Sequence, residues 1–204
     1  MSTLSAAILD LDGLMLDTER VARRAWRQAA ARFGYTMEDS LYERIIGRTV
    51  EGTEEILKEA WGDAFPYRDA LLLQQKLMNR LIAQDRLDRK PGLDEMLTTI
   101  EDLELEMAVA TSAHRPSALR KLAAADMADA FQTMVCGNDV TDGKPAPDIF
   151  LAAASILGVP PSHCVVLEDS DAGALGAHAA GMRVILVPDL KIPSAQTRSV
   201  VWRI

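Results

Sequence analysis

The chain has 204 residues, of which 49% are hydrophobic and 25% are charged, and its formal net charge is −8 at pH 7. This composition is typical of globular proteins and argues against disordered and fibrous classes. The negative charge argues against nucleic acid and anionic membranes as bulk partners. No apolar run approaches the ~18 residues that a bilayer span requires, and the N-terminus lacks the basic, apolar leader of a signal peptide. Cys136 and Cys164 lie in apolar runs and are expected to be reduced core residues, so we expect a cytoplasmic protein.

Short apolar runs alternate with helical periods along most of the chain. Near-continuous apolar runs are typical of strands that are buried on both faces of a parallel sheet. The expected strands are 6–11, 106–110, 133–136, 164–167 and 184–187. Pro116 suits the first turn of a helix that carries Leu119 and Leu122 on one face. Gly158 and Gly181 suit the left-handed ends of two later helices. The alternation predicts an α/β fold with a doubly wound parallel sheet.

The stretch from about residue 17 to residue 89 carries no strand signal. Thr18 is suited to cap a first helix, and further helices are expected after Thr36 and Thr49. A longer helix is expected around apolar residues at helical spacing, namely Leu73, Leu77, Leu81 and Ile82. We therefore expect a core domain of residues 1–16 and 90–204 with an inserted helical cap domain of residues 17–89.

An acidic pair, Asp10 and Asp12, directly follows the first expected strand and is followed by Gly13. In an open α/β sheet, ligands bind beyond the carboxyl ends of the strands. One carboxylate there can bind a metal and attack phosphorus as a covalent nucleophile, and the other can carry a proton to and from the reacting oxygens. The alternative is an ordinary Asp-Gly turn at the end of a strand.

Three more polar clusters follow later strands. Thr111 and Ser112 can hold phosphate oxygens, or they form a helix-capping loop. Lys144, in a loop with a glycine and two prolines, can neutralise a phosphorylated aspartate, or it is a solvated lysine. Glu168 and Asp169 can complete the oxygen shell of a Mg²⁺ ion begun by the first acidic pair, or they are helix N-terminal charges.

These four clusters each follow a different expected strand, which favours one shared site over four coincidences. Clustered carboxylates would raise the pKa of at least one of them unless a cation held them. We therefore predict a single site with metal ligands from Asp10, Asp12, Glu168 and Asp169.

These segments resemble the haloacid dehalogenase (HAD) superfamily, in particular its branch of phosphatases and sugar phosphomutases with a helical cap. The matching segments are 8–19, 110–112, 143–148 and 166–182. The resemblance implies a HAD-like Rossmannoid core and an inserted helical cap that closes over the substrate and sets its specificity.

The resemblance also implies a role for individual residues. Asp10 would be the nucleophile and Asp12 the general acid and base, and Thr111 and Lys144 would hold the phosphoryl oxygens. A Mg²⁺ ion is implied as the cofactor. Its ligands would be Asp10, the main-chain carbonyl of Asp12 and Asp169, with Glu168 nearby or also a ligand.

Departures from the family pattern narrow the choice of reaction. Members that dehalogenate lack the second aspartate, so Asp12 argues against that chemistry. The sugar phosphomutases carry a cap histidine where this chain has Ala22, and a cap arginine near Val50, although Arg48 is close. These differences favour hydrolysis. The segment after Lys191 matches the family weakly, which suggests a truncated or atypical C-terminus.

We therefore expect a Mg²⁺-dependent phosphatase that hydrolyses a small phosphorylated metabolite, a sugar phosphate or a nucleotide, through an aspartyl-phosphate. The alternatives are a sugar phosphomutase of the beta-phosphoglucomutase type and, more remotely, a non-catalytic phosphate-binding or receiver-like signalling module. Besides Thr111 and Lys144, the candidate substrate contacts are Ser112, Glu19, Arg48 and His114, which is otherwise an exposed loop histidine. We expect a monomer or a weak homo-oligomer.

Overall fold

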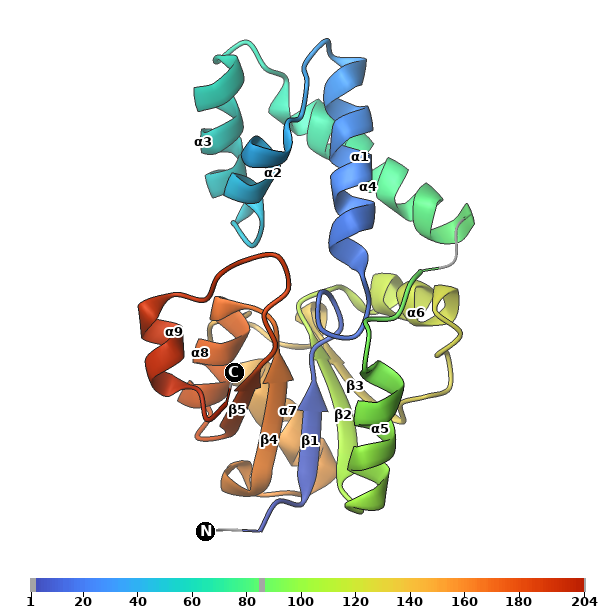
Figure 1. Cartoon of the computed structure of the whole chain (residues 1–204), viewed down its shortest axis with the longest axis vertical. Coiled ribbons are helices and arrows are strands. Elements are labelled where there is room, and N and C mark those ends of the chain that lie inside the picture. The colour runs from blue at the N-terminus through green and yellow to red at the C-terminus, as the bar shows by residue number, and fades with distance from the viewer. Residues whose placement is uncertain (1–2, 85–86, 204) are drawn as a thin grey trace. The chain divides into compact units, whose positions relative to one another are not determined.

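The computed structural model describes residues 3–84 and 87–203. The chain divides into two compact units (Figure 1). The core unit comprises Met1–Asp17 and Leu87–Ile204, and the helical unit comprises Thr18–Arg86. Within the described ranges, no helix is both long enough and apolar enough to span a bilayer.

The described part of the core unit contains a sheet of five parallel strands in the order β3-β2-β1-β4-β5. The strands are β1 (Ala6–Leu9), β2 (Glu106–Thr111), β3 (Thr133–Cys136), β4 (Cys164–Glu168) and β5 (Arg183–Leu186). The central strand β1 is wholly buried, as its unbroken apolar sequence predicts. The predicted doubly wound α/β fold is confirmed.

The first strand ends two residues earlier than expected, at Leu9. The amide of Asp10 still donates to the carbonyl of Leu167 at 3.0 Å, but the chain then turns back on itself, and the amide of Met15 donates to the carbonyl of Leu11 at 3.2 Å. The apolar Leu11 extends the strand-like run in the sequence, although its side chain is buried in this turn and not in the sheet.

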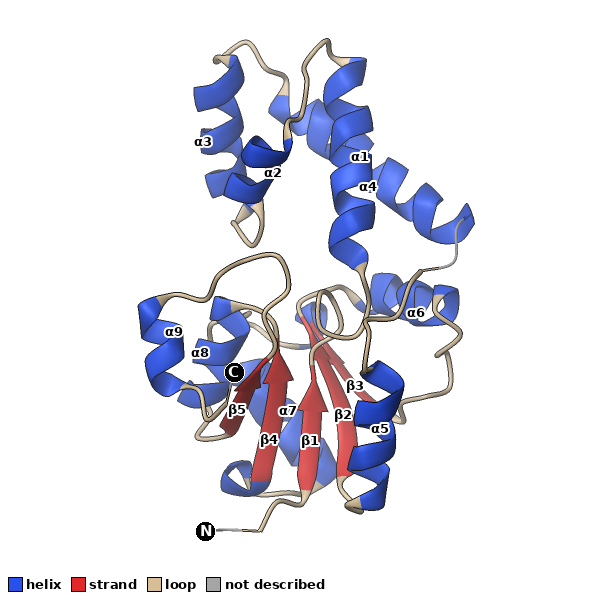
Figure 2. Cartoon of the chain, in the orientation of Figure 1, coloured by secondary structure: helices blue, strands red, loops and turns tan. Residues whose placement is uncertain are grey.

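Helices cover both faces of the sheet, with α7 behind it and α5 in front in the view of Figure 2. The helices of the core unit are α5 (Leu93–Asp102), α6 (Arg115–Ala124), α7 (Asp148–Leu157), α8 (Asp171–Ala179) and α9 (Ala195–Val200). Gly158 ends α7 in the left-handed conformation, as expected. Phe150 of α7 and Ala174 of α8 belong to the same buried cluster as Ile8 of β1. Both cysteines are free and buried, as expected.

The buried face of α6 differs from the one that the sequence predicts. Leu122 is buried, but Leu119 is 48% exposed, so the prediction that both lie on one buried face is wrong. The buried residues instead are Ala118, Lys121, Leu122 and, just after the helix, Ala125. This spacing of three, one and three residues is an ordinary helical stripe. A lysine occupies one of its positions, which hides the stripe from a pattern of apolar residues.

The chain leaves and re-enters the core unit through two adjacent segments. The amide of Asp17 donates to the carbonyl of Asp88, and the amide of Lys90 donates to the carbonyl of Met15, both at 2.9 Å. These two hydrogen bonds pair the outgoing segment with the returning one, so the chain departs from and returns to the same place in the core unit.

The helical unit contains α1 (Thr18–Arg32), α2 (Asp39–Ile45), α3 (Val50–Trp61) and α4 (Tyr67–Gln84). Thr49 caps α3, because its hydroxyl accepts from the amide of Gly52 at 3.1 Å. Aromatic rings pack in its core: the ring centroids of Trp61 and Phe65 lie 4.6 Å apart. On α4, Leu81 and Ile82 are buried as expected.

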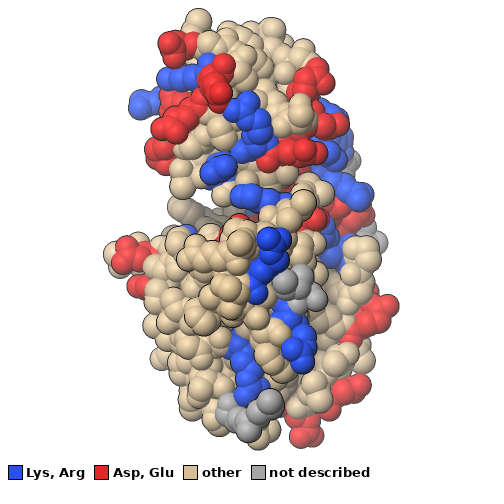
Figure 3. All heavy atoms as spheres, turned by 60° about the vertical axis from the view of Figure 1, so that its left-hand side comes forward, with Lys and Arg blue, Asp and Glu red and all other residues tan. Residues whose placement is uncertain are grey.

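Charged side chains of both signs are interspersed over the helical unit on the face shown in Figure 3. Several charged side chains of the helical unit pair with each other, as Arg27 does with Asp39 and Lys58 does with Glu54, each at 2.6 Å. Exposed pairs of this kind contribute only about 0–1 kcal/mol each to stability. On this face, the helical unit therefore presents a mixed surface and not a patch of one sign.

Candidate active site

Three carboxylates meet at the carboxyl end of the central strands. Leu9 of β1 pairs with Leu167 of β4, so Asp10 and Glu168, the next residue in each segment, become neighbours. Asp10, Glu168 and Asp169 each place a carboxylate oxygen within 4.8 Å of the others. Parallel strands bring their carboxyl ends to one edge, and this edge is where open α/β sheets bind ligands.

A glycine in the turn after β1 leaves room for one of these carboxylates. Gly13 has a φ of +90°, a backbone conformation that residues with a side chain rarely adopt. Its amide donates to the carbonyl of Leu16 at 3.0 Å. A Cβ atom at this position would lie 2.1 Å from Oδ2 of Asp169. The glycine therefore permits both the sharp turn and the close approach of Asp169.

The ammonium of Lys144 lies among these acidic groups. Its Nζ donates to Oδ1 of Asp10 and to Oε1 of Glu168, each at 2.5 Å, and to the carbonyl of Ala110 at 2.9 Å. The side chain is only 5% exposed, although it comes from a surface loop before α7. All three donors of the ammonium are used, so the lysine is fixed in place and is not solvated.

Glu168 is fully buried, and both of its oxygens are satisfied. Oε1 accepts from Lys144, and Oε2 accepts from the amides of Asp169 and Ser170, both at 3.1 Å, and from the Ser170 hydroxyl at 2.9 Å. Gly173 of α8 leaves the necessary space, because a Cβ atom there would lie 1.8 Å from Oε1. These hydrogen bonds to both oxygens hold the Glu168 carboxylate in one orientation.

The pKa of Asp10 is raised to about 7, chiefly by burial; Lys144 opposes the shift, and the charges of Glu168 and Asp12 add to it. Burial alone would lower the pKa of Lys144, but the two carboxylates beside it raise that pKa above its ordinary value. Two buried carboxylates share one ammonium here, so one negative charge is left uncompensated. The site therefore favours an additional cation, either a proton on Asp10 or a metal ion.

Asp12 forms a separate ion pair. Nζ of Lys121, on α6, contacts Oδ1 of Asp12 at 2.6 Å and Oδ2 at 2.7 Å. The Lys121 side chain is 8% exposed, and the Asp12 side chain is 29% exposed. Asp12 is therefore partly open to solvent beside the buried Asp10.

The remaining candidates of the core unit differ in exposure. Thr111 is buried, and its hydroxyl accepts from the amide of Ala113 at 3.1 Å. It directly follows Ala110, whose carbonyl contacts Lys144, so it lies at the same edge. Ser112 and His114 are exposed, and the His114 side chain makes no capping hydrogen bond to α6.

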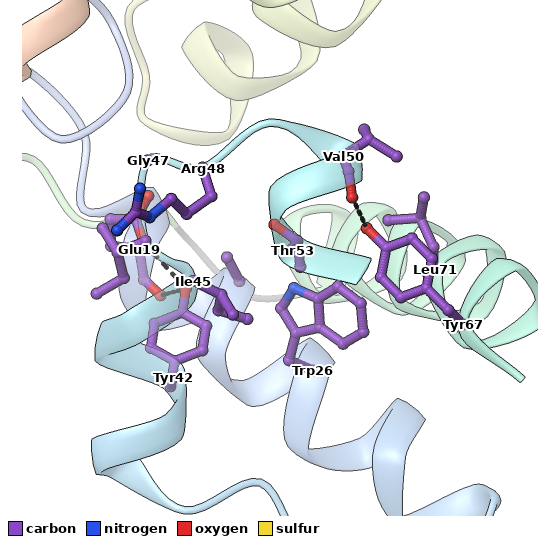
Figure 4. Close-up of a pocket in the computed structure, with 12 residues that line it drawn as sticks. Glu19, Trp26, Tyr42, Ile45, Gly47, Arg48, Val50, Thr53, Tyr67 and Leu71 are labelled. Atoms are coloured by element: carbon purple, nitrogen blue, oxygen red, sulfur yellow. Dashed lines mark hydrogen bonds between the residues drawn. The ribbon is translucent and has the colours of Figure 1, made fainter. Parts of the chain in front are cut away.

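Glu19 and Arg48 belong to the helical unit, where both line a pocket of about 210 Å³ (Figure 4). The Tyr42 hydroxyl donates to Oε2 of Glu19 at 2.9 Å. The indole of Trp26 lines the same pocket, as does Ala22. The two residues that the sequence singled out in this region therefore share one cavity with aromatic walls.

Sequence reasoning missed three contributors: Lys121, the Ser170 hydroxyl and Trp26. A lysine at a buried position of α6 is a detectable signal, because an ammonium there requires a partner. Ser170 follows an acidic pair and is a good helix N-cap, a role it also fills by accepting from the amide of Gly173 at 3.0 Å. Trp26 is indistinguishable in sequence from an ordinary core residue.

Comparisons with known proteins agree with the fold. A family model described as haloacid dehalogenase-like hydrolase matches residues 7–187. A phosphorylated carbohydrates phosphatase of Thermotoga maritima is 32% identical over 185 residues, covering 89% of this chain and 84% of that protein. A beta-phosphoglucomutase of Bacillus subtilis is 31% identical over 189 residues, covering 88% of this chain and 81% of that protein.

Among solved structures, CbbY from Rhodobacter sphaeroides in complex with phosphate matches with a TM-score of 0.78 and 26% sequence identity. The match covers 98% of this chain and 93% of that one. The fold and the site thus define a hydrolase of the α/β class with a helical insertion. The chain belongs to the haloacid dehalogenase-like hydrolase family, and the resemblance found in the sequence is confirmed.

Proposed function

We propose that this protein is a Mg²⁺-dependent phosphatase that hydrolyses a small phosphorylated metabolite through a phosphorylated Asp10. The observation that carries the proposal is the buried carboxylate of Asp10, which contacts the ammonium of Lys144 and lies close to the carboxylates of Glu168 and Asp169. The phosphatase name of the relative from Thermotoga maritima supports the reaction type.

The donor set fits a Mg²⁺ ion. Asp10, Glu168 and Asp169 carry three negative charges, and Lys144 carries one positive charge, so a divalent cation neutralises the cluster. Mg²⁺ prefers oxygen ligands and binds through a few carboxylates together with water and phosphate. Asp10 and Asp169 would hold the ion with the main-chain carbonyl of Asp12, and Glu168 would lie beside it or join the ligands. The bound ion would supply positive charge to the phosphoryl oxygens and to the nucleophile.

In the first half of the reaction, a carboxylate oxygen of Asp10 forms a bond to phosphorus while the ester oxygen leaves. Lys144 stabilises the charge that builds on the phosphoryl oxygens, because the N–H that it now donates to Asp10 can turn to one of them as Asp10 bonds to phosphorus. The Thr111 hydroxyl lies at the same edge and binds a further oxygen. Asp12 gives its proton to the leaving oxygen, which departs as an alcohol.

In the second half, Asp12 takes a proton from a water molecule, and the resulting hydroxide attacks phosphorus. The bond between phosphorus and Asp10 breaks, inorganic phosphate is released, and the Asp10 carboxylate is restored. The same residue serves first as acid and then as base, so the proton that it lost in the first half returns in the second.

The pocket of the helical unit is itself suited to bind a sugar. Glu19 and Arg48 offer an acceptor and a set of donors that suit hydroxyl groups, and Trp26 offers a flat apolar surface that suits the face of a sugar ring. Ser112 and His114 remain candidate contacts on the core unit. A compact sugar phosphate is therefore the favoured substrate class, in agreement with the name of the relative from Thermotoga maritima.

A phosphomutase is the second candidate, because a beta-phosphoglucomutase of Bacillus subtilis is 31% identical to the chain. The position where the phosphomutases carry a cap histidine appears in this chain as Ala22, which lines the pocket and offers no polar group. Release of inorganic phosphate separates the two reactions, because a mutase returns the phosphoryl group to the sugar.

The direct test is phosphate release from a panel of phosphorylated metabolites, measured with Mg²⁺ and with a chelator. We expect release with Mg²⁺, loss of activity with the chelator, and recovery when Mg²⁺ is added in excess. Full activity in the chelator would contradict the metal requirement. Conversion of a sugar phosphate to its isomer without phosphate release would favour the mutase.

Gly173→Ala is expected to disrupt the site through Glu168. The new Cβ atom would lie 1.8 Å from Oε1, so the Glu168 carboxylate must move away from Lys144. We expect phosphate release to fall by at least about tenfold, because small displacements at a catalytic site have large effects on rate. The measurement is kcat/KM in the presence of Mg²⁺.

Gly52→Ala in α3 is the matched control, because its new Cβ atom would lie no closer than 3.5 Å, from the Thr49 hydroxyl. This variant should keep full activity and should be more stable by about 0.5–1 kcal/mol, as a helical alanine usually is. Equal activity of the two alanine variants would show that the position of Glu168 does not matter.

A further inference from the structure

Lys121 is a buried lysine with no role in the reaction described above. It lies on the buried stripe of α6, and its side chain is only 8% exposed. An ammonium that leaves water requires a partner to offset the cost of desolvation. Within residues 3–84 and 87–203, the hydrogen-bond partners of this ammonium are the two oxygens of Asp12, at 2.6 and 2.7 Å.

The contact restricts a side chain that is partly open to solvent. Asp12 lies in the turn after β1, its side chain is 29% exposed, and the next residue is a glycine with a φ of +90°. An exposed carboxylate in such a turn samples several orientations, and each wrong one reduces the fraction of molecules ready to react. Contact of one ammonium with both oxygens holds the carboxylate in a single orientation.

The helix that carries Lys121 is itself fixed at its C-terminal end. The amide of Leu87 donates to the carbonyl of Ala124 at 3.0 Å. Arg89 donates through Nε to the carbonyl of Ala125 and through Nη2 to that of Asp126, both at 2.9 Å. Through these hydrogen bonds, the segment that returns from the helical unit holds the C-terminal end of α6 in place. A rigid support of this kind is what a group that orients a reacting residue requires.

We propose that Lys121 is a positioning residue that holds the general acid and base, Asp12, in the orientation needed to meet the leaving oxygen. The inference rests on the proposed function, because it assigns Lys121 to the proton-transfer step of that reaction. The proposal requires that loss of Lys121 lowers kcat/KM mainly for substrates whose leaving group needs a proton.

The test compares phenyl phosphate with 4-nitrophenyl phosphate in the full-length enzyme with Mg²⁺. The two esters have similar shapes, but nitrophenolate leaves readily without a proton, whereas phenolate leaves poorly. The quantity to measure is kcat/KM, because it reports the steps up to departure of the leaving group. Lys121→Met retains a stem of similar length and removes the charge.

We expect Lys121→Met to lower kcat/KM for phenyl phosphate by at least about tenfold more than for 4-nitrophenyl phosphate, since general acid catalysis contributes about 10²–10⁴-fold. Lys121→Arg, which keeps the charge, should recover at least part of the loss. Equal losses on both esters, or no loss, would overturn the proposal. If Lys121→Met does not fold, Lys121→Gln takes its place. The loss of kcat/KM for phenyl phosphate relative to that for 4-nitrophenyl phosphate should be the same.

The outcome is separable from that of the proposed function. If the parent enzyme releases no phosphate from either ester or from the metabolite panel, the phosphatase itself fails. If the parent is active and Asp10→Asn is not, but Lys121→Met acts equally on both esters, only the positioning role fails.

Discussion

Asp10→Asn is expected to abolish phosphate release, with kcat lowered by at least about 10⁴-fold, as is found when a covalent nucleophile is removed. The amide has nearly the shape of the carboxylate but does not attack phosphorus. The measurement is phosphate release at saturating substrate with Mg²⁺. Asp102→Asn, the same substitution at the exposed end of α5, is the matched control and should keep full activity. Activity of Asp10→Asn within tenfold of the parent would remove the covalent mechanism.

The same substitution should not harm the fold. Burial raises the pKa of Asp10 from its ordinary value of 3.8 to about 7, so the folded protein keeps a proton that the unfolded chain has already released between these two pH values. Stability of the metal-free protein therefore falls as the pH rises across this window. Asparagine has no charge in either state, so Asp10→Asn removes this loss of stability. At pH 8 without metal, Asp10→Asn should melt at or above the temperature of the parent, and a clearly lower melting temperature would contradict this account of the charges.

Lys144→Met is expected to lower kcat/KM at neutral pH by about 10²–10³-fold, the size of effect seen when a donor to developing charge is removed. Lys144 also lowers the pKa of Asp10, against the effect of burial. Without it, the pKa of Asp10 rises above about 7, and less of the nucleophile is ionised at neutral pH. The lost activity should therefore return in part as the pH is raised.

The measurement for Lys144→Met is the pH profile of kcat/KM at a Mg²⁺ concentration well below saturation, where a proton on Asp10 competes with the metal ion. The midpoint of its acidic limb should lie at higher pH than that of the parent. Lys58→Met, which removes an exposed lysine paired with Glu54 in the helical unit, is the control and should leave the profile unchanged. A profile of the parent's shape in Lys144→Met would mean that the ammonium does not set the charge state of Asp10.

Much of the core unit was predictable because its signals are local. The run 164–167, which forms most of β4, is apolar at every residue, as is typical of a central parallel strand. The rule that ligands bind at the carboxyl ends of such strands then places Asp10 and Glu168 at one edge. What the rule does not supply is the register that makes them neighbours, which is set by the pairing of Leu9 with Leu167.

The side-chain contacts of the site join residues far apart in the sequence. Lys121 and Asp12 are separated by 109 positions, and Lys144 and Asp10 by 134. Lys144 was detectable because its loop matches a motif of the family. Lys121 lies in no such motif, and the apolar Leu119 beside it suggested a different buried face. A helix places its buried stripe according to tertiary packing, which overrides a short pattern of leucines.

In the helical unit, too, local features could be predicted from the sequence, whereas features that depend on the packing of distant residues could not. The start of α3 follows from local chemistry, because Thr49 caps it. The pocket does not follow from local chemistry. It is lined by Glu19 of α1, by Arg48, which lies between α2 and α3, and by the indole of Trp26. Glu19 and Arg48 were candidates through their place in the family's cap, and only the packing of the helices shows that they share a cavity.

The central claim is that Asp10 carries the phosphoryl group, and trapping that group on the protein tests it most directly. A substrate labelled in its phosphoryl group is mixed with enzyme and Mg²⁺, the reaction is quenched in acid, and the labelled peptide is identified. With 4-nitrophenyl phosphate and Asp12→Asn, which lacks the base for the second half, we predict that the label accumulates on Asp10. The label should be absent from Asp10→Asn. Phosphate release without any label on Asp10, or label on another residue, would contradict the account.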